Sequence, residues 1–172
     1  MKWILISVGG LAVLVAAMAI VGAWLPRGHV ATRRTSYARP ADELYRIVRD
    51  FAAAPTWRAE LKAVELLPPS EGKVRFRETT RHGTIPFVVV EDRPGGRLVT
   101  EIADPNLPFG GTWTYEFSNE GDRGVLRITE RGEVKNVLFR FLSRFVFGQT
   151  KTIEDYLRAL GRKLGEETTP QP

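Results

Sequence analysis

Residues 73–80 read KVRFRETT and residues 112–117 read TWTYEF, and in both stretches bulky apolar side chains recur at every second position. Because successive side chains of a β-strand point to opposite faces, this period of two predicts strands with one apolar and one polar face. Turns that contain glycine stand at 82–83, 94–96 and 121–124 and divide the surrounding chain into further short strands. The centre of the chain is therefore expected to form an antiparallel meander.

The alternating pattern extends in both directions from these two stretches. A strand over 61–67 comes before them and is expected to end at Pro68 and Pro69, and an earlier strand over 30–37 stands apart from the meander. The remaining strands are expected at 85–91, 98–103 and 125–133. Five or six of these strands form the meander itself.

Two segments carry a helical period instead. The first spans about 40–51 and begins at Pro40, a residue that suits the first turn of a helix. The second runs from 136 to about 165, with a potential kink at Gly148, and a polar tail over 166–172 is expected to be disordered. Only the second segment is long enough to cover the apolar face of a curved sheet. These elements predict an α+β fold in which sheet and helix enclose a cavity.

The first 26 residues predict a transmembrane anchor. No charged residue occurs from Trp3 to Leu25, and a helix of this length extends about 34 Å, enough to cross a hydrocarbon core of about 30 Å. Trp3 and Trp24 lie near the ends, where indole rings favour the headgroup layer. The alternative is a cleaved signal peptide, for which 17–19 offers a small-x-small pattern. The apolar run continues beyond that pattern, which favours an uncleaved anchor.

The flanking charges predict an orientation. Only Lys2 and the amino terminus precede the apolar segment, whereas Arg27, Arg33, Arg34 and Arg39 follow it. By the positive-inside rule, this asymmetry predicts a single-pass protein of the inner or plasma membrane with a cytoplasmic C-terminal domain. The net charge of +5 is interleaved with acids and forms no clustered basic face, so nucleic-acid binding is not expected.

Composition narrows the chemistry further. The chain has no cysteine and only two histidines, His29 and His82, which excludes thiolate and multi-histidine metal centres. Neither a metal nor another cofactor is expected. His82 falls in a predicted turn and His29 follows the apolar segment, and neither is assigned a role. With so few histidines, a serine–histidine–aspartate arrangement has little support.

Short motifs accompany this order of elements. They are ARPADELY at 38–45, DF at 50–51 followed by PTW at 55–57, IADP at 102–105 running into FGGTW at 109–113, and TE at 129–130. Together with the element order, they resemble the START-like superfamily, also described as SRPBCC or polyketide cyclase/dehydrase-like proteins. The resemblance covers about residues 29–165 and marks 27–165 as one ligand-binding domain.

The resemblance implies a helix-grip fold, in which a seven-stranded sheet wraps a C-terminal helix around a hydrophobic tunnel. Members of the superfamily carry lipids, sterols, quinones or polyketides, and some catalyse cyclisation or dehydration. The superfamily has no universal catalytic motif, so the resemblance assigns no catalytic residue to this chain.

Two carboxylates are candidates for acid–base chemistry. Glu78 is in phase with Phe76, and Glu130 is in phase with Ile128, so both are expected to point toward the cavity. A carboxyl group in an apolar cavity has a raised pKa and can act as an acid or a base, or can hold the polar end of a ligand. The alternative for each is an ion pair with a nearby arginine.

Aromatic side chains are the candidate ligand contacts. Bulky rings on the inner face of a sheet suit a flat or long apolar ligand, although core packing explains the same pattern. The candidates are Phe76, Phe87, Phe109, Trp113, Tyr115, Phe117, Phe141 and Phe145. The phenylalanine-rich segment that holds Phe141 and Phe145 suits either a membrane-facing portal or packing under the edge of the sheet.

The sequence is compatible with three functions. The first is membrane-tethered binding or transfer of a hydrophobic small molecule, such as a lipid, a quinone or a polyketide-like compound. The second is an enzyme of cyclase or dehydratase type that uses a cavity carboxylate. The third is a partner-binding module without catalysis, whose interior is simply a filled core.

Overall fold

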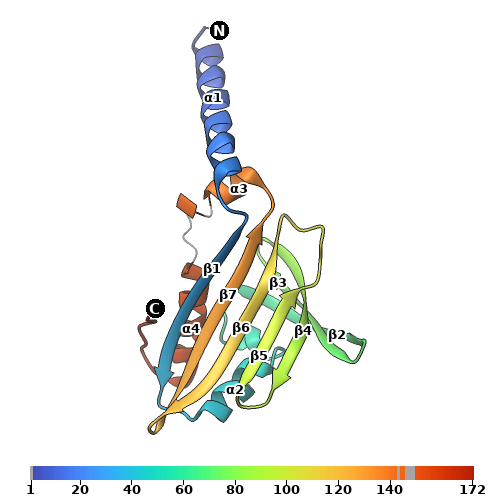
Figure 1. Ribbon diagram of the computed structural model, residues 1–172, viewed down its shortest axis with the longest axis vertical. Helices are drawn as coiled ribbons and strands as arrows, with labels where there is room; N and C mark the ends of the chain where they lie inside the picture. The colour runs from blue at the N-terminus through green and yellow to red at the C-terminus, as the bar shows by residue number, and fades with distance from the viewer. Residues whose placement is uncertain (1, 143, 146–149) are drawn as a thin grey trace.

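The computed structural model describes residues 2–142, 144–145 and 150–172. A long helix, α1 (Lys2–Trp24), precedes β1 (Gly28–Tyr37), α2 (Ala41–Arg49) and the 3-10 turn η1 (Ala54–Thr56). The meander follows as β2 (Leu61–Ser70), β3 (Lys73–Thr80), β4 (Gly83–Arg93), β5 (Arg97–Ile102), β6 (Phe109–Glu120) and β7 (Arg123–Val134). Helices α3 (Val137–Leu142) and α4 (Lys151–Leu164) come last along the chain (Figure 1).

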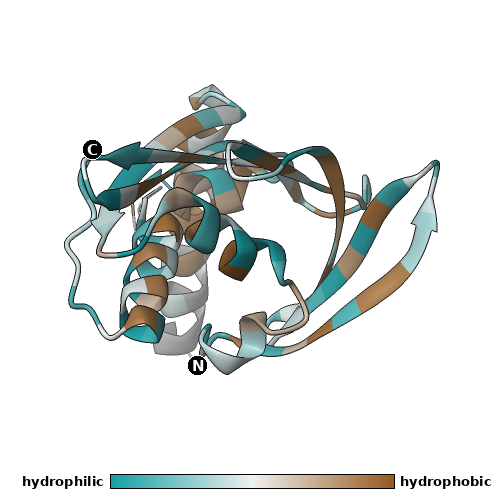
Figure 2. Ribbon diagram, turned by 90° about the horizontal axis from the view of Figure 1, so that it is seen from below, coloured by the Kyte–Doolittle hydropathy of each residue, from teal (hydrophilic) through white to brown (hydrophobic). Residues whose placement is uncertain are grey.

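The strands of the described chain form a seven-stranded antiparallel sheet in the order β1-β7-β6-β5-β4-β3-β2. Strands β2 to β7 each pair with their neighbours in sequence, whereas β1 pairs with β7 over its whole length. The sheet curves around α2 and α4, as Figure 2 shows from below. The predicted α+β helix-grip architecture, with its antiparallel meander and C-terminal helix, is confirmed.

Strand β2 extends further than its sequence predicts. It continues past Pro68 and Pro69 to Ser70, with a register shift against β3 after Leu67. β2 lies at the edge of the sheet. An edge strand tolerates proline because the backbone N–H groups on its outer side have no neighbouring strand to donate to.

The core lies between the sheet and the two helices. Side chains from α4 pack against alternate side chains of the central strands, and the hydroxyl of Tyr37 in β1 donates a hydrogen bond to the carbonyl of Leu157 in α4 at 2.9 Å. The largest fully buried side chains are Tyr37, Leu44, Leu98, Leu126, Ile128, Ile153, Leu157 and Leu160. The apolar side chains of α4 therefore pack against the inward-facing side chains of the strands, as the sequence patterns predict.

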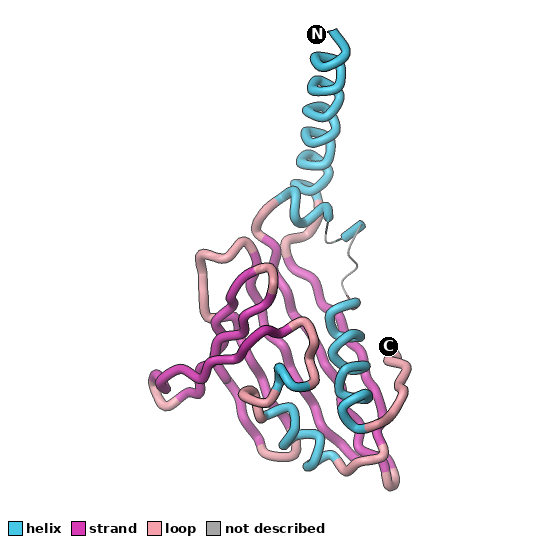
Figure 3. Tube along the Cα trace, turned by 180° about the vertical axis from the view of Figure 1, so that it is seen from behind, coloured by secondary structure: helices cyan, strands magenta, loops and turns pink. Residues whose placement is uncertain are grey.

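The C-terminal segment is two helices instead of the single long helix that we expected over 136–165. Helix α3 ends at Leu142 and lies against α1, whereas α4 begins at Lys151 and lies against the sheet (Figure 3). The two helices lie against different partners, so one straight helix cannot serve both. Gly148, where we expected a kink, lies outside the described residues.

The tail over 166–172 lies along β1, although its composition predicts disorder. Arg34 and Gln171 exchange two backbone hydrogen bonds of 2.9 Å, and the carboxylate of Glu166 accepts from the amide of Ala38 at 2.9 Å. β1 is the other edge of the sheet, so its outer backbone groups are available to a pairing segment. The tail is held by hydrogen bonds to β1, which is far away in the sequence, and composition alone cannot predict such contacts.

Helix α1 forms where the apolar segment predicts a helix, and it projects from one end of the sheet (Figure 1). No helix in the part of the chain that the structure describes is long and apolar enough to cross a membrane.

Candidate functional site

The inner face of the sheet carries a stack of three phenylalanine rings on the side of β3 and β4. The ring of Phe76 lies 4.0 Å from that of Phe51 and 5.2 Å from that of Phe87, measured between centroids, and both pairs are nearly parallel. Phe76 and Phe51 are buried, whereas Phe87 stays partly exposed. The stack provides a flat apolar surface that reaches toward solvent at Phe87.

A second aromatic group surrounds Tyr156 of α4. The rings of Trp57, Trp113 and Tyr115 have centroids 5.2, 5.9 and 5.7 Å from the ring of Tyr156. Burial is the largest cause that raises the pKa of both tyrosine phenols, Tyr115 and Tyr156, above their ordinary range. Both phenols therefore stay neutral at physiological pH and act as hydrogen-bond donors or acceptors.

Glu78, one of the two candidate carboxylates, is held in an ion pair with Arg58. The two nitrogens Nη1 and Nη2 of Arg58 lie 2.6 and 3.3 Å from the two oxygens of Glu78, and the side chains are only 13% and 14% exposed. The guanidinium carbon also lies 5.0 Å from the ring centroid of Tyr156. Burial is the largest single influence and lowers the pKa of Arg58, but the combined charge interactions with Glu78, Tyr156, Tyr115 and Glu60 outweigh it and raise that pKa. This carboxylate is committed to its partner and is a poor candidate for proton transfer.

Glu130, the other candidate carboxylate, has a different environment. Its Oε1 lies 3.5 Å from Nε2 of His29, and the two side chains are 22% and 15% exposed. Burial is the largest influence and raises the pKa of Glu130, while the charge of His29 and hydrogen bonds from Trp113 and His29 oppose it. A carboxyl group with a raised pKa beside an imidazole can exchange a proton with a ligand.

Glycine makes room for the imidazole of His29. His29 in β1 is the register partner of Gly132 in β7, which in turn faces Gly111 in β6. A Cβ atom at 132 would lie 2.2 Å from Cε1 of His29, so the ring lies directly over the bare backbone of Gly132. From there the ring reaches diagonally to Glu130, two residues earlier on the same face of β7.

Trp57 presents a buried donor with no acceptor among the described residues. Its indole Nε1 has no hydrogen-bond partner, although the atom is excluded from solvent. Trp57 also borders a cleft of about 350 Å³ between α2 and α4. The other lining residues of that cleft are Glu43, Arg46, Ile47, Asp50, Ala53 and Lys163. An oxygen atom of a bound molecule at this point would satisfy the indole.

The predicted ligand contacts fall into two places. Phe76, Phe87, Trp113, Tyr115 and Phe117 come together on the inner face of the sheet, where the sequence period of two puts them.

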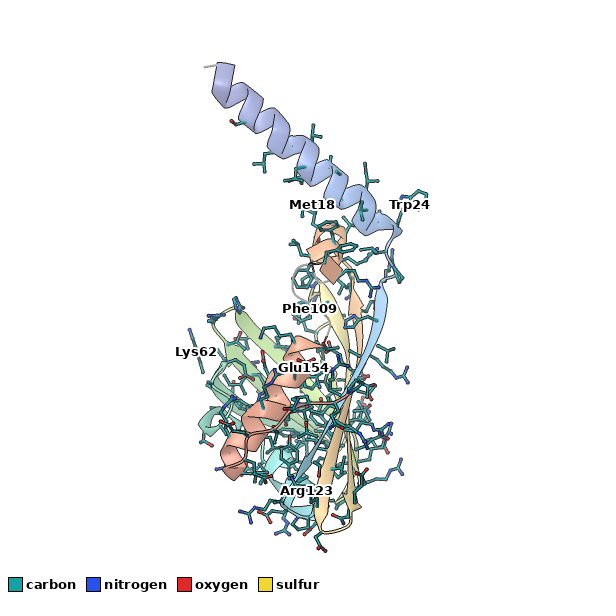
Figure 4. The ribbon with its side chains drawn as sticks, turned by 90° about the vertical axis from the view of Figure 1, so that its left-hand side faces the viewer. Met18, Trp24, Lys62, Phe109, Arg123 and Glu154 are labelled. Carbon is teal, nitrogen blue, oxygen red and sulfur yellow. The ribbon has the colours of Figure 1, made fainter. Side chains whose placement is uncertain are left out.

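The other three predicted contacts lie at the end of the sheet that faces α1 and α3. Figure 4 shows Phe109 there, and its ring is 6.3 Å from that of Phe139. Phe141 and Phe145 pack on each other at 5.0 Å, and Phe145 is 59% exposed. The structure therefore does not bring Phe109, Phe141 and Phe145 together with the inner aromatic groups.

Four residues of this interior were not predicted as site residues from the sequence. His29 is in phase with Ala31 on the inner face of β1, and Tyr156 follows Ile153 on the apolar stripe of α4, so both could have been placed by periodicity. Trp57 and Arg58 lie between η1 and β2, where no period applies. Only the tertiary structure puts Arg58 beside Glu78.

Comparisons with other proteins agree with this architecture. Residues 28–165 match a family model described as polyketide cyclase / dehydrase and lipid transport. A START superfamily protein from Mycobacterium smegmatis superimposes with a TM-score of 0.59 at 18% identity, over 80% of this chain and 97% of that one. No curated protein sequence matches the chain.

Two further solved structures have the same fold. A protein from Thermus thermophilus gives a TM-score of 0.66 at 17% identity, over 79% of this chain and 97% of that one. An aromatase/cyclase from Streptomyces sp. R1128 gives 0.64 at 12% identity, over 80% and 94%. At such identities the likeness shows the fold alone.

Proposed function

Because the chain belongs to the polyketide cyclase/dehydrase and lipid-transport family, we propose that it binds a hydrophobic small molecule between the sheet and α4. The observation that carries the proposal is the buried, unpartnered Nε1 of Trp57 within an aromatic interior. A buried donor without an acceptor costs about 1–3 kcal/mol, which a ligand oxygen at this atom would remove.

The aromatic side chains define the shape of the ligand. Phe87, Trp113 and Trp57 are only partly buried although they contact the core, so each offers apolar surface that a ligand can cover. Flat or long apolar molecules that carry an oxygen fit this surface, as lipids, quinones and polyketide-like compounds do. Glu130 and His29 offer a second polar contact for such a ligand.

We further propose that α1 tethers this domain to a membrane. The sequence of α1 is uncharged from Trp3 to Trp24, and at 1.5 Å per residue the helix extends about 34 Å. Trp24 is 89% exposed and Arg27 follows it, as expected at a membrane–water interface. The charge asymmetry favours a domain on the cytoplasmic side of an inner or plasma membrane. An apolar ligand partitions into the bilayer, so a tether keeps the binding site close to its source.

The test is to purify the full chain in a mild detergent and to analyse co-purifying molecules by native mass spectrometry and solvent extraction. We expect one apolar, oxygen-bearing compound at near-stoichiometric amount in the wild type. Trp57→Phe, which keeps the ring and removes the N–H donor, should reduce its occupancy, whereas Trp24→Phe serves as the matched control. An empty wild-type protein, or equal occupancy in both variants, would contradict the proposal.

A second candidate function is acid–base catalysis on the bound molecule, as in a cyclase or dehydratase. The raised pKa of Glu130 and the adjacent imidazole of His29 favour it. Glu130→Gln should then abolish turnover of the extracted compound while its binding persists. If Glu130→Gln changes neither turnover nor binding, the protein acts as a carrier or a partner-binding module.

A further inference from the structure

A pocket of about 270 Å³ lies where α1, α3 and β1 meet, apart from the aromatic interior. It is lined by Leu25, Pro26, Arg27, Gly28, His29, Val30, Val134, Arg140 and Arg144. The described lining thus contains three arginines, and none of these lining residues is acidic; His29 is not counted among the cations because it lies 3.5 Å from the carboxylate of Glu130. Such a lining creates a positive potential that attracts an anion.

Arg140 is the fixed cation of this pocket. Its side chain is inside the protein, since the residue is only 6% exposed. Its guanidinium donates to the carbonyls of Gly22 and Leu25 at the end of α1, at 3.0 and 3.1 Å, and to those of Val134 and Lys135 after β7, at 3.1 and 3.2 Å. These contacts hold the guanidinium in one place and join α1 to the end of the sheet.

A close helix contact makes this joint rigid. A Cβ atom at Gly22 would lie 2.0 Å from the carbonyl oxygen of Val137, so only glycine allows α1 and α3 to approach this closely. The pocket therefore has walls that do not depend on a bound molecule. Preformed walls reduce the ordering cost of binding.

The surroundings of the pocket are apolar on the side of α1. Val21 is 43% exposed, Trp24 is 89% exposed and Phe145 of the α3 region is 59% exposed. Apolar groups and a cationic pocket side by side match an amphiphile whose charged group is an anion. A guanidinium fork binds carboxylate or phosphate oxygens by two parallel hydrogen bonds, and a phosphate has further oxygens that can accept from a second arginine at the same time.

We propose that this pocket binds a phosphate group, with Arg27 and Arg144 as its cationic contacts and the charge of Arg140, whose donors bond to backbone carbonyls, fixed beside them. A phospholipid headgroup and a free phosphate ion share this chemistry. The lipid source rests on the proposed membrane tether, because the acyl chains would then lie along α1. The phosphate chemistry of the pocket does not depend on that tether.

The experiment measures binding to the full chain in neutral detergent micelles by calorimetry and native mass spectrometry. Three probes are compared: dioctanoyl phosphatidic acid, dioctanoylglycerol, which lacks the phosphate, and inorganic phosphate. We expect phosphatidic acid to bind at least about ten-fold more tightly than dioctanoylglycerol.

Variants locate the site. Arg140→Gln removes the contacts that join α1 to the sheet and is expected to disrupt the fold. The binding test therefore uses Arg27→Gln and Arg144→Gln. Each should weaken the binding of phosphatidic acid by about ten-fold, the effect of losing one charged hydrogen-bond donor. Arg127→Gln, on the outer face of β7, is the matched control and should stay within about two-fold of the wild type.

The outcomes separate the two sources. Tighter binding of phosphatidic acid than of inorganic phosphate supports a lipid headgroup, and equal binding supports a soluble phosphate as the occupant of the same pocket. Equal binding of dioctanoylglycerol and phosphatidic acid, or equal losses in all three arginine variants, overturns the proposal. Extraction of the protein from membranes by alkaline carbonate tests the tether separately, so its failure does not affect the inorganic phosphate measurement.

Discussion

At the scale of single residues, Glu78 and Glu130 show how the neighbourhood decides the chemistry of a side chain. Both occupy the inner phase of a strand, and their sequence context offers no reason to separate them. Arg58 turns Glu78 into half of an ion pair, whereas burial beside His29 raises the pKa of Glu130. The candidate for proton exchange is therefore Glu130.

Glu78→Gln should destabilise the protein strongly. The substitution removes the buried one of the two carboxylates that pair with Arg58 and leaves the guanidinium only Glu60, whose side chain is 52% exposed. Breaking such a pair costs about 3–5 kcal/mol, whereas replacing both partners by apolar residues is often neutral. Urea unfolding of Glu78→Gln and of the double variant Arg58→Met/Glu78→Leu checks this, and the double variant should recover most of the loss.

The matched control for this variant is Glu65→Gln. Glu65 pairs with Arg77 on the surface, where the side chains are 62% and 44% exposed. Surface pairs contribute at most about 1 kcal/mol. Equal effects of Glu78→Gln and Glu65→Gln would show that the inner pair is not buried in solution.

Glu130 should give the free energy of unfolding a distinctive pH dependence. Its pKa is raised in the folded state above the ordinary value of 4.5, so the folded state holds the proton more tightly than the unfolded state. This contribution is complete below the unfolded pKa and is lost as the pH rises through the folded pKa. The difference in unfolding free energy between wild type and Glu130→Gln should therefore shrink or reverse on raising the pH from about 4 to 7. A difference independent of pH would contradict the raised pKa.

At the scale of elements, glycines permit the close approaches that shape the site. Gly111 in β6 has a φ of +138°, and a Cβ atom there would lie 2.2 Å from the carbonyl oxygen of Arg131 in β7. Its neighbour Gly110 has nothing within 4 Å of the same position. The pairing of β6 with β7 therefore requires glycine at position 111 but leaves room for a side chain at position 110.

Gly111→Ala should lower the free energy of unfolding by about 1–3 kcal/mol or more, because the added methyl group meets backbone and the φ angle is unfavourable. Gly110→Ala should leave it within about 1 kcal/mol of the wild type. Thermal and urea unfolding of the two variants measure the difference. Similar stabilities of the two variants would show that β6 and β7 do not approach as closely as the structure has them.

At the scale of the whole molecule, the sheet has two edge strands, β1 and β2, and the tail pairs with β1. The bridge between Gln171 and Arg34 and the contact of Glu166 with Ala38 hold the tail along β1 (Figure 3). An uncovered edge is a template for pairing with another chain. The tail therefore occupies backbone groups of β1 at Arg34 and Ala38 that another chain could otherwise pair with.

Truncation after Glu166 should expose this edge. The amide of Arg34, which donates to the carbonyl of Gln171 at 2.9 Å, should exchange with solvent at least about ten-fold faster in the truncated protein. The amide of Leu126, in the sheet interior on β7, serves as the internal control. Unchanged exchange at Arg34, measured by hydrogen–deuterium exchange NMR, would mean that the tail does not pair with β1 in solution.

The sequence by itself determined the fold class and the inward phase of the site residues. Periods of two and 3.6 are local properties of the chain, so they identified the strands, the faces that carry Phe76, Trp113 and Glu130, and the apolar stripe of α4. The same patterns together with the element order pointed to the family. Local periodicity also predicted a helix at α1.

Only the tertiary structure decided which inward residues meet. Arg58 lies twenty residues from Glu78 and His29 lies about a hundred from Glu130 along the chain, so their contacts depend on strand register and loop path. The same holds for Arg140, which joins α3 to α1, and for the tail on β1. Such long-range contacts leave no periodic trace, because a hydrogen bond or an ion pair needs one partner at one distance and imposes no pattern on its neighbours.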